Sequence, residues 1–255
     1  MSTMRKYLIL CFIVLFMVSC TTDRTIAPRD VKRASELNAQ LGLGYLKQRQ
    51  YKRAQGKLEK ALGYDSDNAN AHHYMGELYR RLNDSENAEK HFKIAMDLAP
   101  EDLTIQNNYG VYLCDSGKYD EAIALFIKPL SDSLYDNKAR SYENIGLCRL
   151  RQGQITQAEK AFKQALKLNS NMSTSLLQLA KMRFDGGNSV AAYSLYSRYI
   201  AIAQQTPESL WLGILLESGR GAKNTVSSYK VKLKGKYPDS KETKLLLKLE
   251  RLGKI

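Results

Sequence analysis

The sequence contains few of the residues from which catalytic and metal sites are usually built. Among 255 residues it has three histidines, four cysteines and one tryptophan. His72 and His73 are adjacent, and adjacent side chains on a helix point about 100° apart, so they are poorly placed to share a metal. No glycine-rich phosphate loop is present, and no Ser, His and Asp combination has a recognisable catalytic context. We therefore expect no enzyme activity, no cofactor and no metal site.

Proline is also scarce, with five residues, and long low-complexity tracts are absent. Little proline means few helix breakers, and the rest of the chain is rich in strong helix formers. These features predict an all-α protein. The one long apolar run, from Tyr7 to Val18, is shorter than the ~20 residues that a bilayer-spanning helix needs.

This apolar run has the features of an export signal. It follows Arg5 and Lys6 and ends in the sequence MVSC at 17–20, which resembles the lipobox of bacterial lipoproteins. The resemblance implies a signal peptide at 1–19, lipidation of Cys20 and a lipidated tether at 20–34. Acyl chains on Cys20 would anchor the protein, because each buried methylene contributes ~0.8 kcal/mol. By the bacterial sorting rules, Thr21 favours the outer membrane, facing the periplasm. A plain signal peptide with a chance cysteine and a short membrane anchor are the alternatives.

A glycine recurs every 34 residues, at Gly42, Gly76 and Gly110. Repeat two shows the surrounding pattern in full: Met75, Gly76, Tyr79, Ala88, Phe92, Ala95 and Pro100. This is the spacing of the tetratricopeptide repeat, a pair of helices in which small residues let the two helices approach closely. Stacks of such pairs usually bind other proteins and rarely perform chemistry.

The period continues and predicts about six repeats in a domain spanning 35–255. The expected boundaries are 35–68, 69–102, 103–138, 139–172, 173–207 and 208–241, with a capping helix at 242–255. Pro129 is expected to end or kink the second helix of repeat three, and the connection at 131–138 is expected to be longer than usual. In repeat six we assign Trp211 to the first aromatic position. The expected fold is an all-α, right-handed superhelix, or solenoid.

The formal net charge is +13 and is concentrated at the two ends. Residues 21–58 carry nine Lys/Arg and three acids, and residues 218–255 carry eleven Lys/Arg and three acids. Basic ends suggest acidic partners or membrane headgroups, whereas ordinary solvated helix faces are the simpler interpretation. Nucleic acid is not an expected partner, because an exported lipoprotein does not meet it routinely.

Two of the four cysteines have assigned roles, since Cys11 leaves with the signal peptide and Cys20 carries lipid. Cys114 and Cys148 remain, in the first helices of neighbouring repeats and in an oxidising compartment. A disulfide between repeats three and four is one interpretation. Two small buried hydrophobic residues are the other, because packed helices are about 8–10 Å apart while bridged Cα atoms lie within ~7 Å.

The inner wall of a tetratricopeptide superhelix is lined by the second, fifth, ninth, twelfth and thirteenth positions of each first helix. The predicted partner-binding groove therefore comprises Ala39, Leu43, Leu46, Lys47, His73, Glu77, Arg80, Asn107, Val111, Leu147 and Leu150. Its leucine pairs are apolar at positions where partners dock in such proteins. The alternative is that these leucines contact neighbouring repeats.

The sequence NNYGVYLC at 107–114, followed by GKYDEA at 117–122, resembles repeat three of the type IV pilus biogenesis lipoproteins of the PilF/PilW family. The sequence NIGLC at 144–148 resembles repeat four of that family and supplies its second cysteine. The lipobox, the number of repeats and the total length also agree, so the resemblance covers essentially the whole chain.

The resemblance implies a pilotin, an outer-membrane lipoprotein that binds secretin subunits of the type IV pilus and promotes their localisation and multimerisation. We hypothesise that repeats one to three grip the secretin segment. The implied partners are the secretin, outer-membrane lipid through Cys20, and other pilus-assembly proteins. The alternative function is a scaffold for peptidoglycan hydrolases or envelope assembly factors, which would use the same fold and address. A chaperone for the pilin subunit is a further alternative.

Overall fold

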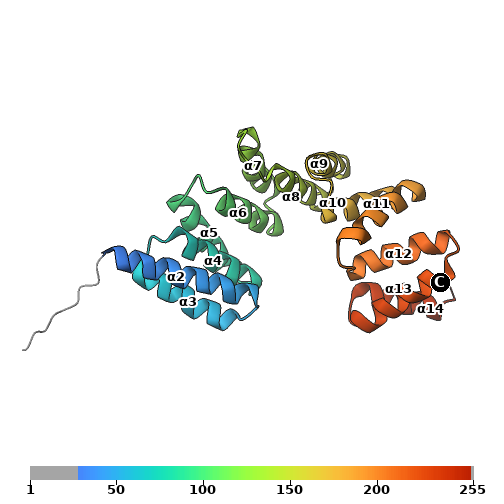
Figure 1. Ribbon diagram of the computed structural model, residues 1–255, viewed down its shortest axis with the longest axis horizontal. Coiled ribbons are helices and arrows are strands. Elements are labelled where there is room, and N and C mark those ends of the chain that lie inside the picture. The colour runs from blue at the N-terminus through green and yellow to red at the C-terminus, as the bar shows by residue number, and fades with distance from the viewer. Residues whose placement is uncertain (1–27, 254–255) are drawn as a thin grey trace, which may run out of the picture. The chain divides into compact units, whose positions relative to one another are not determined.

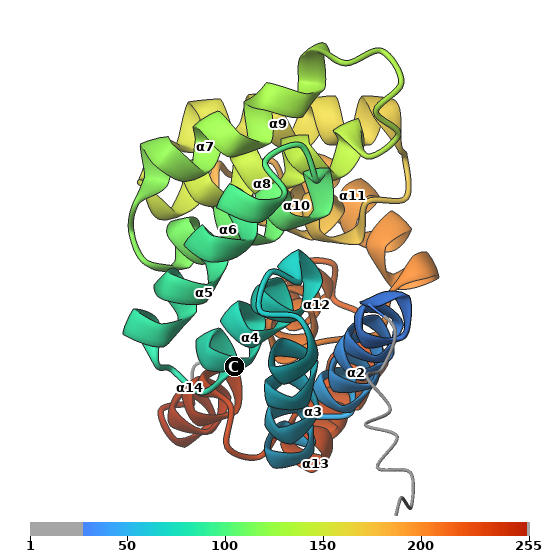
Figure 2. The same cartoon turned by 90° about the vertical axis from the view of Figure 1, so that its left-hand side faces the viewer.

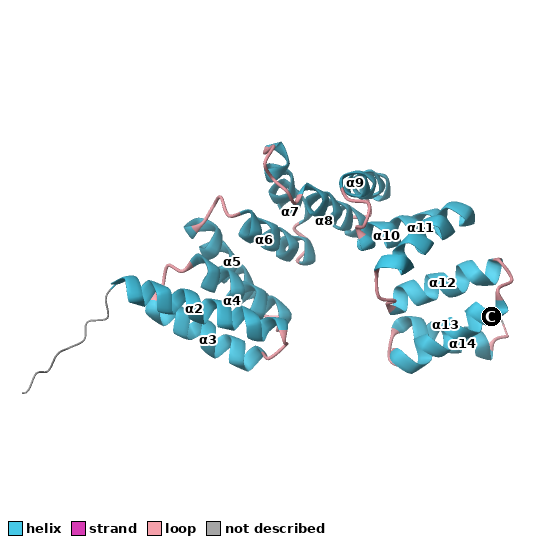
Figure 3. Cartoon of the chain, in the orientation of Figure 1, coloured by secondary structure: helices cyan, strands magenta, loops and turns pink. Residues whose placement is uncertain are grey.

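The computed structural model describes residues 28–253, and in this part of the chain it contains thirteen α-helices, one 3-10 helix and no strand (Figure 3). The predicted all-α class is thereby confirmed. The predicted signal peptide at 1–19 and the lipidation site Cys20 lie outside the described residues.

The helices follow one another as six pairs and a last single helix (Figure 1). Their bounds are α2 Pro28–Lys47, α3 Tyr51–Tyr64, α4 Ala69–Arg81, α5 Ser85–Leu98, α6 Leu103–Asp115, α7 Tyr119–Ile127, η1 Lys128–Ser131, α8 Lys138–Arg151, α9 Ile155–Leu168, α10 Ser173–Asp185, α11 Ser189–Ile202, α12 Pro207–Gly219, α13 Lys223–Lys236 and α14 Lys241–Arg251. The chain divides into two compact units, with the boundary between Tyr74 and Met75.

The first unit contains α2, α3 and the beginning of α4. Its helices approach closely through Ala39, Ala61 and Ala71, all fully buried. The Oγ of Ser35 donates a hydrogen bond to the backbone oxygen of Ala61 at 2.8 Å, which fixes α2 against α3. The predicted tether at 20–34 is wrong for its last residues, because α2 already begins at Pro28. Proline suits the first helical position, where its missing N–H has no helical partner.

In the second unit, a glycine in the first helix of a pair faces a buried aromatic ring in the second helix. A Cβ atom at Gly110 would lie 2.7 Å from Phe126, and one at Gly146 would lie 2.6 Å from Phe162. Both rings are almost completely buried, with exposed fractions of 1% and 0%. The recurring glycine therefore leaves the space that the ring fills.

The first helices of successive pairs contact one another, from α6 through α8, α10 and α12 to α14. Figures 1 and 2 both show α6, α8 and α10 side by side. These helices form one layer of the second unit, and the positions predicted to face a partner follow one another along it.

The end of repeat three agrees with the prediction from Pro129. Helix α7 stops at Ile127, and Pro129 lies in the short 3-10 helix Lys128–Ser131. A longer connection then leads to α8 at Lys138. The two residues that lengthen this repeat are accommodated here, outside the packed helices.

Repeat six corrects one assignment. Helices α10, α12 and α14 begin at Ser173, Pro207 and Lys241, so their starts are 34 residues apart. In this register the buried Leu210, and not Trp211, takes the first packing position. Our assignment of Trp211 was wrong by one residue because repeat six lacks the aromatic residue that would have marked the position. The predicted cap is present as α14, which repeats the register of a first helix.

Candidate protein-binding surface

A network of charged side chains joins the first helices of repeats two, three and four. The Nε atoms of Arg80 and Arg81 each donate to Glu77 at 2.8 Å. Arg80 also donates to Asp115 on α6 at 2.8 Å, and Arg151 on α8 donates to the same carboxylate at 2.6 Å. We call these five residues the polar ladder. It connects α4, α6 and α8 along the predicted groove.

The charges of the polar ladder stabilise one another. Burial acts to raise the pKa of Glu77, but hydrogen bonds and positive charge from Arg80 and Arg81 outweigh it and hold the pKa below its ordinary value. In return, the hydrogen bond from Arg80 to Glu77 raises the pKa of Arg80. The pairs remain partly exposed to solvent, so each contributes modestly to stability.

Uncharged polar contacts extend the same layer of helices. Asn144 on α8 donates to Asn107 on α6 at 2.8 Å. The backbone N–H and the hydroxyl of Ser175 on α10 both donate to Glu143 on α8, at 2.9 and 2.8 Å. The first helices of the middle repeats are therefore joined by hydrogen bonds, one of which uses the predicted groove residue Asn107.

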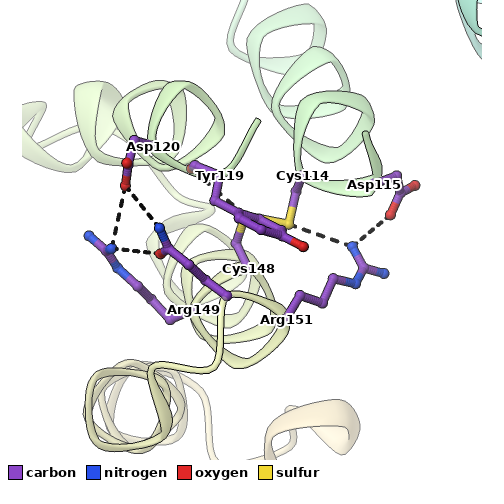
Figure 4. Close-up of a disulfide and its surroundings, with 8 residues drawn as sticks. Cys114, Asp115, Tyr119, Asp120, Cys148, Arg149 and Arg151 are labelled. Carbon is purple, nitrogen blue, oxygen red and sulfur yellow. Dashed lines mark hydrogen bonds and ion pairs between the residues drawn. A yellow bond between two sulfur atoms is a disulfide. The ribbon is translucent and has the colours of Figure 1, made fainter. Parts of the chain in front are cut away.

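A disulfide joins α6 to α8 beside the polar ladder (Figure 4). The Cα atoms of Cys114 and Cys148 are 5.7 Å apart, within the range for a bridge. Of the two interpretations of these cysteines, the structure contains the bridge. Arg151 approaches the Sγ of Cys114 at 3.5 Å while it donates to Asp115. The bridge thus holds the two helices at the point where Asp115 and Arg151 form their ion pair.

Three of the predicted groove residues are wrong, because they are buried and offer a partner no surface. Ala39 and Leu46 are 0% and 1% exposed, and His73 is 3% exposed. Ala39 packs against Ala61 of α3 and Ala71 of α4. The fifth position of this first repeat is therefore covered by the next helix along the chain.

The other predicted groove residues keep accessible surface. Lys47 is exposed, and the remaining side chains are half-buried: Leu43, Glu77, Arg80, Asn107, Val111, Leu147 and Leu150. Leu147 and Leu150 pack against a cluster that includes Phe162 and Leu179, so part of their apolar surface contacts neighbouring helices. That contact agrees with the alternative interpretation of the leucine pair. A role in partner binding stays a prediction for all of these residues.

The structure shows a second groove, outside the residues predicted from the sequence. It runs along α10, α12 and α14 in the second unit and consists of two adjoining hollows of about 340 and 570 Å³. The hollows share Glu208, Lys241 and Glu242. We call it the C-terminal groove. Its main lining residues are Leu177, Lys181, Phe184, Trp211, Glu242 and Leu245.

The repeat period could have identified the C-terminal groove. Leu177, Trp211 and Leu245 are 34 residues apart and take the fifth position of α10, α12 and α14. Phe184 takes the twelfth position of α10. The same rule that selected the earlier groove residues therefore selects these, once the register of repeat six is corrected. The sequence could not predict that these side chains surround an open hollow.

The part of the chain that the structure describes has features that bear on metal binding and on membrane insertion. Within 28–253, no cluster of three or more His, Cys, Asp or Glu side chains is arranged to hold a metal ion. No helix in this range is both long enough and apolar enough to span a membrane.

Comparisons with known proteins find tetratricopeptide-repeat families and pilus proteins. Two tetratricopeptide-repeat family models match, one over residues 101–170 and the other over 40–95 and 144–207. The type IV pilus assembly protein PilF of Pseudomonas aeruginosa is 31% identical over 209 residues, which cover 82% of this chain and 83% of that protein.

Two solved structures are similar over most of the chain. A structure of Pseudomonas aeruginosa PilF has a TM-score of 0.73 at 29% identity and covers 86% of this chain and 98% of that one. The crystal structure of PilW, a widely conserved type IV pilus biogenesis factor, has a TM-score of 0.71 at 27% identity and covers 84% and 98%.

Proposed function

Because the chain belongs to the PilF/PilW family of tetratricopeptide-repeat proteins of type IV pilus biogenesis, we propose that it acts as a pilotin. In this proposal it is a lipoprotein of the outer membrane that faces the periplasm. It binds secretin subunits, helps bring them to the outer membrane and promotes their multimerisation. The similarity to a pilus assembly protein across the repeats is the observation that carries the proposal.

This function requires attachment to the membrane, a short connection between the anchor and the folded domain, and a surface that binds a polypeptide. Lipid on Cys20 would attach the protein to the membrane, since acyl chains partition into a bilayer. Because α2 begins at Pro28, the chain between Cys20 and the helix can reach at most ~30 Å when fully extended. The protein would therefore hold its partner close to the membrane surface. No energy source is needed, because binding and release follow affinity alone.

The first experiment compares secretin multimers in envelopes from three strains: wild type, a deletion of this gene, and Cys20→Ala. Immunoblots of unboiled envelopes separate the multimer from the monomer. We expect the multimer to disappear in the deletion strain, and to persist away from the outer membrane in the Cys20→Ala strain. Normal multimers in both mutant strains would refute the secretin role.

A second experiment tests the partner surface on α2. Leu43 is half-buried and occupies a predicted groove position, whereas Leu37 on the same helix is 52% exposed and lies outside the predicted positions. We expect Leu43→Glu to abolish co-purification of the secretin and Leu37→Glu to leave it intact, with helical circular dichroism unchanged in both. Unchanged binding by Leu43→Glu rejects this patch. Leu46 is unsuitable for the test, because a charge at a buried position would disturb folding.

A further inference from the structure

The C-terminal groove differs in chemistry from the polar ladder. Phe184, Trp211 and Leu245 line its smaller hollow, whereas Leu177 at the larger hollow is buried in the core and serves only as its floor. Trp211 is the only tryptophan of the chain and is half-buried, and Leu245 is 41% exposed. Accessible aromatic and leucine side chains in a concave site are typical anchors of protein binding.

The charged residues of the smaller hollow favour a cation. Asp185, Glu208 and Glu242 line it together with Lys181 and Lys241. Lys181 and Glu208 form an ion pair, so their charges compensate each other. Two carboxylates then remain against one lysine, although residues 218–255 as a whole carry eleven Lys/Arg and three acids. The groove is thus an acidic site in a basic part of the protein, and such a contrast attracts and orients basic ligands.

The side chain of Glu242 is largely buried, and its one ion pair is long. Its side chain is 10% exposed, and the Nζ of Lys241 lies 3.7 Å away on a side chain that is itself 90% exposed. That separation is too long for a hydrogen bond. The carboxylate lines the groove, so a donor on a ligand can form with it the short charge-assisted hydrogen bond that Lys241 does not form. Glu242 lines both hollows, so a ligand in either one can reach it.

The size and shape of the groove favour a polypeptide over a compact small molecule. The smaller hollow, of about 340 Å³, has room for one large side chain and its neighbours. The larger hollow continues past Glu208 and Glu242 along α10 to Thr174 and Leu177. A ligand that fills both hollows must be elongated.

We propose that the C-terminal groove binds a peptide segment of a partner protein that carries an aromatic or branched apolar residue next to a lysine or arginine. The apolar side chain packs against Phe184, Trp211 and Leu245 in the smaller hollow. The basic side chain donates to Glu242, and the peptide backbone continues into the larger hollow. This site is separate from the predicted groove residues of the earlier repeats.

The intrinsic fluorescence of Trp211 allows a direct test on the purified protein, because it is the only tryptophan present. Three synthetic octapeptides of the same length serve as probes: one with Phe and Lys at adjacent positions, one with Phe and Glu, and one with Ser and Lys, in an otherwise identical Ala/Ser sequence. We expect a saturable shift of the emission to shorter wavelength with the Phe-Lys peptide. Its affinity should exceed that of each other peptide by at least about tenfold.

Variants then test the two contacts by calorimetry. Glu242→Gln keeps the size of the side chain and should remove the preference for Phe-Lys over Phe-Glu, while Trp211→Ala should weaken all binding by about tenfold or more. Glu250→Gln is the matched control, because Glu250 lies on the same helix but pairs with Lys230 and Lys234 outside the groove. The proposal is overturned if no peptide gives a saturable change, if the three peptides bind equally, or if Glu242→Gln behaves like Glu250→Gln.

This inference does not require that the partner be the secretin. If the Phe-Lys peptide binds as expected while secretin multimers form normally in the deletion strain, the groove proposal stands and the pilotin function fails. If multimers are lost in the deletion strain and no peptide binds, the pilotin function stands and the groove proposal fails.

Discussion

Replacing Gly146 by alanine should destabilise the protein, although alanine is the better helix former. A Cβ atom at this position would lie 2.6 Å from Cε1 and 2.7 Å from Cδ1 of Phe162, which is fully buried. Overpacking of this kind costs ~1–3 kcal/mol, whereas exchanging glycine for alanine in a helix gains ~1 kcal/mol. We therefore expect a net loss of about 1 kcal/mol in the free energy of unfolding.

The sign of this effect should reverse when the ring is absent. Phe162→Ala alone should cost ~3–5 kcal/mol, because it removes a fully buried aromatic side chain and leaves a cavity. In that background Gly146→Ala meets no ring, so the helix gain of ~1 kcal/mol remains and the added methyl fills part of the cavity. The expected coupling energy between the two positions is ~2 kcal/mol.

The four proteins of this cycle can be compared by urea denaturation followed by helical circular dichroism. Gly56→Ala is the control, because Gly56 lies in α3 with no atom within 4 Å of an added Cβ. It should stabilise by up to ~1 kcal/mol. If Gly146→Ala also stabilises the wild-type protein, or has the same sign in both backgrounds, the close contact with Phe162 does not explain the recurring glycine.

Three further predictions concern stability. Because the pKa of Glu77 is lowered in the folded protein, its carboxylate stabilises the fold above the pKa of an unfolded carboxyl, and this contribution is lost as pH falls through the folded pKa. The difference in free energy of unfolding between wild type and Glu77→Gln should therefore become smaller on acidification, as measured by denaturation at a series of pH values. Reduction of the Cys114–Cys148 bridge, which spans a sequence separation of 34, should cost ~3–4 kcal/mol, and the reductant should not affect a Cys114→Ala/Cys148→Ala protein. Leu46→Ala should cost ~2–5 kcal/mol and Leu37→Ala less than ~0.5 kcal/mol in the same denaturation assay, because only Leu46 is buried.

The repeat period predicted the helix pairs because it reports a local requirement. A glycine and an aromatic residue 16 positions later must meet wherever two helices cross closely, as Gly110 and Phe126 do. Pro129 likewise acts on its own helix, so its effect could be predicted from sequence. The start of α2 at Pro28 could not, because residues 28–34 precede the first repeat and carry none of its pattern.

The burial of individual groove positions depends on the neighbouring elements and not on the residue's own repeat. Ala39 and Leu43 occupy adjacent groove positions of α2, yet Ala39 is fully buried by packing with α3 and α4 while Leu43 is half-buried. A position in the repeat specifies which face of its helix a side chain is on. It does not specify whether the next helix covers that face.

Within the second unit, the middle repeats and the C-terminal groove differ in how far their groove positions are free to bind a partner. In the middle repeats, polar side chains at these positions bind each other, as Asp115 does with Arg80 and Arg151, and a disulfide fixes two of their helices. A partner that bound there would have to replace existing ion pairs, so its net gain would be small. At Trp211 and Glu242 the apolar surface is accessible and the carboxylate lacks a close donor. A partner there would have no short ion pair of Glu242 to displace, so within the second unit the largest losses of affinity on mutation should map to α10, α12 and α14.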